Sequence, residues 1–171
     1  IQDVLGHLAN DQTRIAFIVE RIRSAYSKGR KTLVLTERTE HLMQIYTSLV
    51  NNVPELFLLH GRMSKKQRAE LVSSLNALSD EKPRILLSTG KLVGEGFDHP
   101  ALDTLVLAMP ISWRGNLQQY AGRLHREHAL KTNVQIIDFV DATHPILLKM
   151  WNKRRIGYKA MGYELVSDEA I

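Results

Sequence analysis

Two arginines three residues apart are the side chains best suited to chemistry in this sequence. Arg123 and Arg126 close the run Gln-Tyr-Ala-Gly-Arg-Leu-His-Arg that begins at Gln119. A helix expected over residues 116–126 would place both guanidinium groups on one face. Guanidinium groups that reach into a neighbouring domain can neutralise charge on a transferring γ-phosphate, a contribution of about 10³–10⁵ in rate. The alternative is a surface ion pair, for instance with Glu127, and an arginine pair taken in isolation favours that alternative.

A glycine-rich segment that follows Ser88 is the second feature with chemical potential. Gly90, Gly94 and Gly96 let the backbone approach a phosphate or a base closely, and Asp98 adds a carboxylate. The segment could equally be a plain connector. Gly90 and the lysine after it do not belong to a Walker phosphate-binding loop, because leucine stands where that loop requires Ser or Thr.

Short apolar runs alternate with helical patterns and predict the elements that position these residues. The predicted strands cover residues 32–36, 56–59, 84–88, 104–108 and 134–140. The predicted helices cover residues 11–27, 42–50, 64–78, 116–126 and 146–160. Gly29 ends the first helix, and Ser64 and Gln67 have capping-box spacing.

This alternation predicts an α/β fold with a mainly parallel sheet covered by helices on both faces, since parallel neighbours need a crossover between them. Ligands of such sheets bind beyond the carboxyl ends of the strands. The segments that directly follow the predicted strands should therefore carry the function.

Composition and charge limit the classes of protein to consider. A chain of 171 residues with 44% hydrophobic and 24% charged residues suits one packed core. The net charge of +5 favours a polyanionic partner weakly. The absence of cysteine excludes disulfides and thiolate metal sites and permits a reducing compartment, so a cytoplasmic location is expected. No apolar stretch approaches the ~18 residues of a membrane span, and no membrane partner is expected.

Four segments, in order, resemble motifs of superfamily 2 helicases. Gln-x-x-Gly-Arg-x-x-Arg at 119–126 resembles motif VI, Thr89 to Asp98 resembles motif V, and residues 32–36 with Arg38 resemble motif IV. His60-Gly61, followed by Gln67-Arg68, is similar to the family's segment after the second strand. Four ordered motifs are more specific than any one of them. The resemblance, over roughly residues 31 to 140, implies a three-layer α-β-α RecA-like domain, the C-terminal one of DEAD/DEAH-type helicases.

The resemblance implies a role for each matching residue. Arg123 and Arg126 would be arginine fingers that act on ATP. Gly96, Asp98 and Gln119 would lie at the nucleotide, with Asp98 near the ribose. The residues that would face the nucleic-acid backbone are Thr36, Arg38, Gly61, Arg62, Thr89 and Gly90. Backbone N–H groups and hydroxyls suit a translocase, which holds phosphates without reading sequence.

Parts of a complete ATPase site are missing from this sequence. The family's first motor domain supplies a Gly-Lys-Ser/Thr phosphate loop and an Asp-Glu pair for the metal, and neither stands in a strand-loop context here. ATP and Mg²⁺ would therefore be held mainly by an N-terminal RecA-like domain of the same polypeptide, and this chain alone would be inactive. The first residue, Ile1, is not Met, which fits a piece of a larger protein.

The expected function is the second motor domain of an ATP-dependent nucleic-acid helicase or translocase. The Glu-Gly-Phe-Asp-x-Pro form of motif V looks most like DNA repair or restriction helicases, so DNA is expected rather than RNA. The expected division is an N-terminal helix leading in (1–30), the RecA-like domain (31–162) and a loose C-terminal end (163–171). The alternative function is a non-catalytic nucleic-acid-binding module that keeps this fold.

Two further groups of side chains have a functional and a plain interpretation. His125 and His128 are three apart, but no third ligand for zinc is evident, so a solvated face is favoured and no metal site is expected. Basic residues crowd the last predicted helix at Lys149, Lys153, Arg154, Arg155 and Lys159. They could contact nucleic acid or remain solvated, and the second interpretation is slightly favoured.

Overall fold

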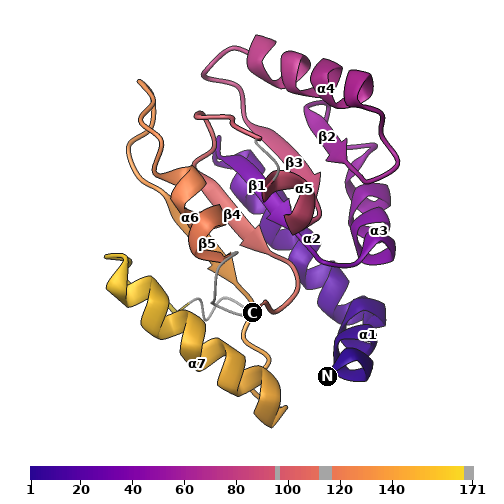
Figure 1. Ribbon diagram of the computed structural model, residues 1–171, viewed down its shortest axis with the longest axis vertical. Helices are drawn as coiled ribbons and strands as arrows, with labels where there is room; N and C mark the ends of the chain where they lie inside the picture. Colours follow the sequence, from indigo (N-terminus) through magenta and orange to yellow (C-terminus); the bar gives the residue numbers. More distant parts are fainter. Residues whose placement is uncertain (95–96, 112–116, 168–171) are drawn as a thin grey trace.

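Five parallel strands form the centre of the molecule in the computed structural model, which describes residues 1–94, 97–111 and 117–167 (Figure 1). The strands are β1 (Lys31–Leu35), β2 (Leu56–Leu59), β3 (Arg84–Ser88), β4 (Thr104–Leu107) and β5 (Gln135–Asp138). Their order in the sheet is β2-β3-β1-β4-β5, and every pairing is parallel. The predicted α/β class is confirmed.

Helices cover both faces of this sheet (Figure 1). One face carries α2 (Gln12–Ser27) and α3 (Thr39–Leu49), and α1 (Gln2–Asn10) packs against both of these helices. The other face carries α4 (Lys65–Ala77), α5 (Gly90–Gly94), α6 (Gln118–Leu124) and α7 (Pro145–Ala160). The result is the three-layer α-β-α arrangement that the resemblance implied.

Alternating residues of the central strand enter two separate hydrophobic cores. Leu33 and Leu35 of β1 pack on the side of α4 to α7, whereas Val34 packs on the side of α2 and α3. All three are buried, because β1 has strands on both edges and helices on both faces. Ile18 and Ile22 of α2 complete the second core. The N-terminal segment thus holds two helices where one was expected, and α2 is part of the core.

Side-chain caps mark the helix boundaries where the sequence predicted them. The Ser64 hydroxyl accepts from the Gln67 backbone N–H, and the Gln67 side chain accepts from the Ser64 N–H, so the capping box is confirmed. Asp11 accepts from two backbone N–H groups in the first turn of α2. Gly29 has a φ of 81°, a left-handed conformation that favours glycine and ends this helix as predicted.

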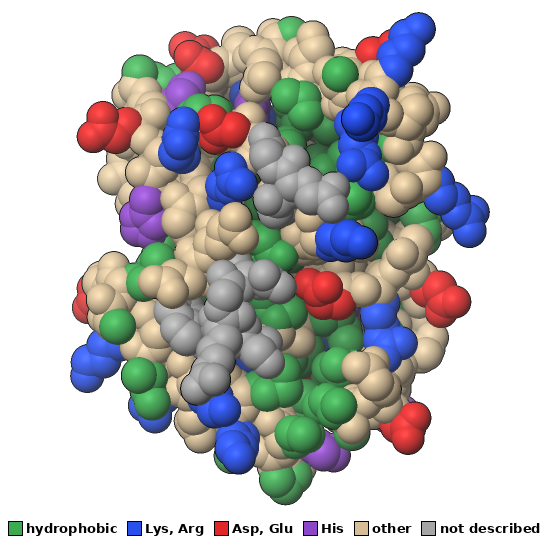
Figure 2. All heavy atoms as spheres, viewed as in Figure 1, with side chains coloured by type: hydrophobic (Ala, Val, Ile, Leu, Met, Phe, Trp, Pro, Cys, Tyr) green, Lys and Arg blue, Asp and Glu red, His purple; other side chains and the backbone are tan. Residues whose placement is uncertain are grey.

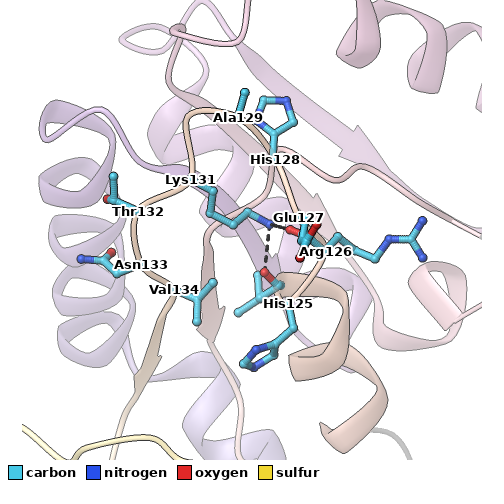
Figure 3. A pocket seen from close by; sticks show the side chains of 10 residues that line it. His125, Arg126, Glu127, His128, Ala129, Lys131, Thr132, Asn133 and Val134 are labelled. Atoms are coloured by element: carbon cyan, nitrogen blue, oxygen red, sulfur yellow. Dashed lines mark hydrogen bonds between the residues drawn. The ribbon is translucent and has the colours of Figure 1, made fainter.

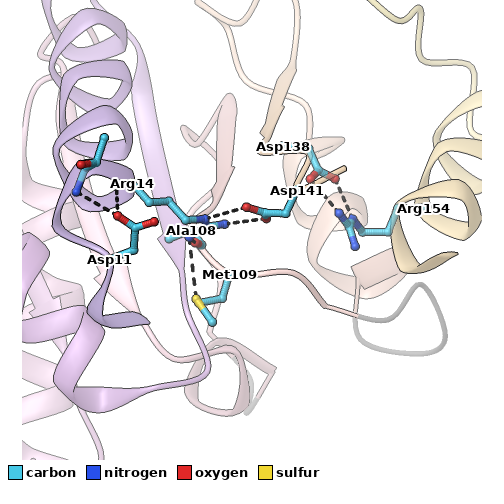
Figure 4. Close-up of polar contacts among 8 residues, drawn as sticks. Asp11, Arg14, Ala108, Met109, Asp138, Asp141 and Arg154 are labelled. Carbon is cyan, nitrogen blue, oxygen red and sulfur yellow. Dashed lines mark hydrogen bonds and ion pairs between the residues drawn. The ribbon is translucent and has the colours of Figure 1, made fainter. Parts of the chain in front are cut away.

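Two buried arginines fasten helices to the ends of strands (Figure 4). Arg14 of α2 pairs with Asp141 at 3.1 Å and donates to the Ala108 carbonyl at 2.7 Å. Arg154 of α7 pairs with both carboxylate oxygens of Asp138 at 2.7 and 2.9 Å. Buried charges of this kind are stable only while paired. These contacts fix α2 and α7 beside the carboxyl ends of β4 and β5.

Charged side chains are spread over one face of the molecule rather than concentrated in one patch. On the face shown in Figure 2, Lys and Arg side chains lie in several groups, with hydrophobic and acidic side chains between them. Charge alone therefore marks no single binding surface on this face. Within the described ranges, no helix has the length and apolar character needed to cross a membrane.

Candidate functional site

The segments expected to face nucleic acid follow three adjacent strands. Leu35 of β1 and Leu59 of β2 both lie opposite Ser88 of β3, so these strands end at the same level. The loops that follow them start side by side at one edge of the sheet. This edge gathers the residues predicted for nucleic-acid contact, which are Thr36, Arg38, Gly61, Arg62, Thr89 and Gly90.

Thr36 differs from the others because its side chain lies inside the protein. It is 1% exposed, and its hydroxyl oxygen lies 2.9 Å from Nδ1 of His41. Burial lowers the pKa of His41 to about 4, and the positive charges of Arg14 and Arg38 add to this effect. The hydroxyl therefore pairs with a neutral imidazole in this structure, whereas the resemblance implied that Thr36 faces the nucleic-acid backbone.

Arg38 is half-buried and contacts the N-terminal helix. Its Nη2 donates to the backbone oxygen of Gln2 at 3.0 Å and to the side-chain oxygen of the same residue at 3.1 Å. Gly6 lies next to the guanidinium, since a Cβ added there would be 3.9 Å from it, an ordinary van der Waals distance. Helix α1 therefore borders the edge of the sheet where nucleic acid is expected.

The loop after β2 is exposed to solvent. Gly61 and Arg62 are both exposed, and nothing lies within 4 Å of a Cβ added at Gly61. The Arg62 N–H donates to Nδ1 of His60 at 3.3 Å, which holds the turn. This loop can therefore present the guanidinium of Arg62 to a phosphate.

Gly90, at the start of α5, lies in a crowded place. A Cβ added there would lie 2.6 Å from Oε1 of Glu37 and 2.6 Å from the hydroxyl of Tyr120. Tyr120 belongs to α6 and is 2% exposed, so its ring cannot move aside easily. A glycine is required for this close approach. The contact joins the loop after β1, the start of α5 and helix α6.

Arg126, a predicted finger, contacts Asp98, a predicted nucleotide residue. Nη2 of Arg126 lies 3.0 Å from Oδ2 of Asp98, and the two side chains are 56% and 41% exposed. An ion pair this exposed contributes at most about 1 kcal/mol. The guanidinium can therefore turn to another anion at little cost. Glu127, the ion-pair partner considered from the sequence, is not the partner of Arg126 in this structure.

The expected common helical face for the two arginines is wrong. Helix α6 ends at Leu124, so Arg123 lies in its last turn while Arg126 belongs to the loop beyond it. Arg123 is half-buried and makes no hydrogen bond or ion pair with residues of the described ranges. Gln119 is exposed on the same helix. Gly96, the remaining predicted nucleotide residue, lies outside the described residues.

Lys131 caps the C-terminal end of α6 (Figure 3). Its Nζ donates to the carbonyl of Leu124 at 2.9 Å and to that of Arg126 at 2.6 Å. The Leu124 carbonyl has no backbone partner within the helix and accepts from this side chain instead. Nothing in the local sequence pattern indicated this contact, because it depends on the path of the loop. Residues 124–129 and 131–134 line a surface cavity of about 660 Å³ around this lysine.

The two histidines of this loop have separate partners. Nε2 of His125 lies 2.8 Å from the hydroxyl of Tyr163, and Nε2 of His128 lies 3.3 Å from Asp80. They hold the loop at two points and do not form a pair. Across the described residues, no group of three or more His, Asp or Glu could hold a metal ion.

A buried polar chain holds the segment that contains Asp98. Its neighbour His99 is 6% exposed, and Arg84 donates to Nε2 of this histidine at 3.2 Å. Nδ1 then carries the proton and donates to Oδ1 of Asn76 at 2.7 Å. Burial lowers the pKa of His99 to about 4, and the charge of Arg84 contributes. His99 is therefore neutral at pH 7 and connects this segment to β3 and α4.

Comparison with known proteins identifies a family for this chain. Residues 13–128 match the family described as helicase conserved C-terminal domain. The chain is 39% identical over 87 residues to uncharacterized protein 108L of Invertebrate iridescent virus 3. This alignment covers 51% of the chain and 79% of that protein. The chain is also 26% identical over 132 residues to transcript termination protein A18 of Yaba monkey tumor virus (strain VR587). This alignment covers 76% of the chain and 27% of that protein.

The fold is similar to that in the crystal structure of T4 UvsW. The TM-score is 0.78 at 19% identity, and the match covers 97% of the chain and 36% of UvsW. The chain thus spans about a quarter of the A18 protein and about a third of UvsW.

Proposed function

The chain belongs to the helicase conserved C-terminal domain family, as a superfamily 2 RecA-like domain, and we propose that it is the second motor domain of a longer ATP-dependent translocase. In this proposal the domain closes on a first RecA-like domain when ATP is bound and reopens after hydrolysis. Repeated closure would move the protein along nucleic acid.

The exposed contact between Arg126 and Asp98 is the observation that carries this proposal. Both side chains were assigned to the nucleotide by resemblance, from segments 28 positions apart, and they lie 3.0 Å from each other on the surface. A guanidinium held by a weak ion pair can exchange its carboxylate partner for a phosphate. Arg123, which has no partner among the described residues, would supply the second positive charge.

In this proposal the residues present would form one side of an ATP site. Arg123 and Arg126 would bind the phosphates, and Asp98 and Gln119 would contact the nucleotide edge. The bound nucleotide would supply the transferable phosphoryl group and Mg²⁺ would offset its charge, both held mainly by the first domain. This chain would contribute positive charge and orientation but no phosphate loop, so it would not hydrolyse ATP alone.

The edge formed by the loops after β1, β2 and β3 would hold the nucleic-acid backbone. Gly61 and Arg62 are open to solvent there, and Thr89 and Gly90 follow the central of these three strands. Gly90 touches Tyr120 of α6, the helix that carries Arg123. This contact offers a short route by which phosphate binding at one edge could affect the arginines.

DNA is the proposed substrate rather than RNA, on the sequence form of the segment around Asp98. The alternative, a passive nucleic-acid-binding module, predicts binding without any effect on ATP turnover. Adding this chain to a separately produced first motor domain, with DNA or RNA of equal length, distinguishes the two. Stimulated ATP hydrolysis supports the motor assignment, and stronger stimulation by DNA supports the substrate. Binding with no stimulation favours the passive module.

A further inference from the structure

The ammonium of Lys131 lies at the end of α6, beside the loop that carries Arg126 (Figure 3). It donates to two carbonyls, that of Leu124 at 2.9 Å and that of Arg126 at 2.6 Å. One of these belongs to the last residue of the helix and the other to the arginine itself. The lysine therefore bridges the rigid helix and the backbone that presents the guanidinium.

Carbonyls at the end of a helix have no backbone partner within it, and a cation near them is favourable. Here the same cation also fixes the orientation of the peptide group at Arg126. The side chain of that arginine is more than half exposed, with a single ion pair to Asp98. Its own side-chain contacts therefore restrain it little, and its direction depends on the backbone that Lys131 holds.

We propose that Lys131 is a positioning residue for Arg126, which it holds at the angle needed to reach a phosphate bound by the neighbouring domain. This inference rests on the proposed function, since it assigns a supporting part to the same site. Lys131 touches neither nucleotide nor nucleic acid in this proposal. It acts only through the backbone of the arginine.

Other contacts keep the loop in place when this lysine is changed. His125 is held by Tyr163 and His128 by Asp80, so both sides of Arg126 keep an attachment. Lys131 is only half-buried, and water can reach carbonyls that lose its ammonium. Loss of the lysine should therefore loosen one peptide group and leave the domain folded.

The test is single-turnover ATP hydrolysis by the longer protein that contains this chain. Lys131→Met should lower the rate constant roughly 10- to 100-fold, as expected for a small misplacement of a catalytic group. The KM for ATP, the affinity for nucleic acid and the melting temperature should change little. Lys131→Arg, which keeps the charge and the donors, should restore part of the rate. Lys28→Met is the matched control, because Lys28 also follows a helix but lies at the opposite layer.

A double variant separates positioning from other effects. If Lys131 acts through Arg126, then Lys131→Met should cause no further loss in an Arg126→Ala background. An equal loss in both backgrounds would overturn the inference, as would a normal rate in Lys131→Met alone. Should that variant fail to fold, Lys131→Gln serves for the same comparison.

The rates of the two single variants distinguish a failure of the finger assignment from a failure of the positioning role of Lys131. A normal rate in Arg126→Ala would overturn the finger assignment and this inference together. A slow Arg126→Ala protein with a normal Lys131→Met protein would overturn this inference alone.

Discussion

Nη2 of Arg126 lies 3.0 Å from Oδ2 of Asp98, which joins the loop after α6 to the segment after α5. The two residues are 28 positions apart in the chain. Each was assigned to the nucleotide separately, through a different motif, and the fold brings them together at an exposed position. The relationship matters because an exposed ion pair orients a side chain without holding it strongly.

Replacement of Asp98 by Asn removes the charge of this pair and should affect function more than stability. The free energy of unfolding should fall by less than about 1 kcal/mol, because the pair is solvent-exposed. Urea unfolding of the 171-residue chain measures this change. In the longer protein, the KM for ATP should rise, since Asp98 is proposed to contact the nucleotide. A stability loss of several kcal/mol would show instead that the pair is structural.

Gly90→Ala should destabilise the domain by about 1–3 kcal/mol, because the added methyl group would meet Glu37 and the buried Tyr120 at 2.6 Å. Gly61→Ala is the matched control, since a Cβ there has no neighbour within 4 Å. Its effect should stay within about 0.5 kcal/mol. Urea midpoints of the two variants give the comparison. Equal midpoints would mean that the contact with α6 does not require glycine.

Acid should weaken the fold in the range set by two buried histidines. His41 and His99 have pKa values of about 4 in the folded chain, below the ordinary 6.5. The unfolded chain therefore binds more protons, so stability is complete above pH 6.5 and declines as the pH falls toward 4. Each histidine can account for at most roughly 3 kcal/mol of this loss. Urea unfolding at several pH values tests this, and His99→Gln should reduce the slope. A flat profile between pH 7 and 4.5 would contradict it.

Arg154→Ala should cost about 3–5 kcal/mol, because it leaves the carboxylate of Asp138 buried without its cation. The adjacent Arg155 is exposed, and Arg155→Ala should change stability by no more than about 0.5 kcal/mol. Thermal unfolding of the two variants compares a buried and an exposed arginine in the same turn of α7. Similar melting temperatures would mean that the Arg154 pair does not anchor this helix.

The sequence was sufficient for the main elements of the fold, because their signals are local. The apolar run of β1 and the capping box at Ser64 depend on neighbouring residues, and both have the predicted structure. The end of α6 was misplaced for the opposite reason. The carbonyl of its last residue, Leu124, accepts from Lys131, and this contact forms only when the loop folds back. Helix α5 was missed because its glycines are typical of a connector.

The candidate site was assigned from motif positions, and these positions do not determine the contacts of its residues. The resemblance to helicase motifs placed Thr36 among the residues expected to face nucleic acid, yet its hydroxyl is buried against His41. The side chain of Arg38 lies against Gln2 of α1, a helix that the sequence did not reveal. Positions in a motif give the order of residues along the chain, whereas burial depends on which distant helix covers each one.

The rate of ATP hydrolysis by Arg126→Ala in the longer protein is the measurement that tests the central claim most directly. Single-turnover assays should show a fall of about 10³-fold or more, as for the loss of an arginine finger, while the affinity for DNA stays within a few-fold of the unchanged protein. Arg155→Ala, a change at an exposed arginine outside the site, should hydrolyse ATP normally. An unchanged rate in Arg126→Ala would contradict the claim that this domain supplies a finger to its neighbour.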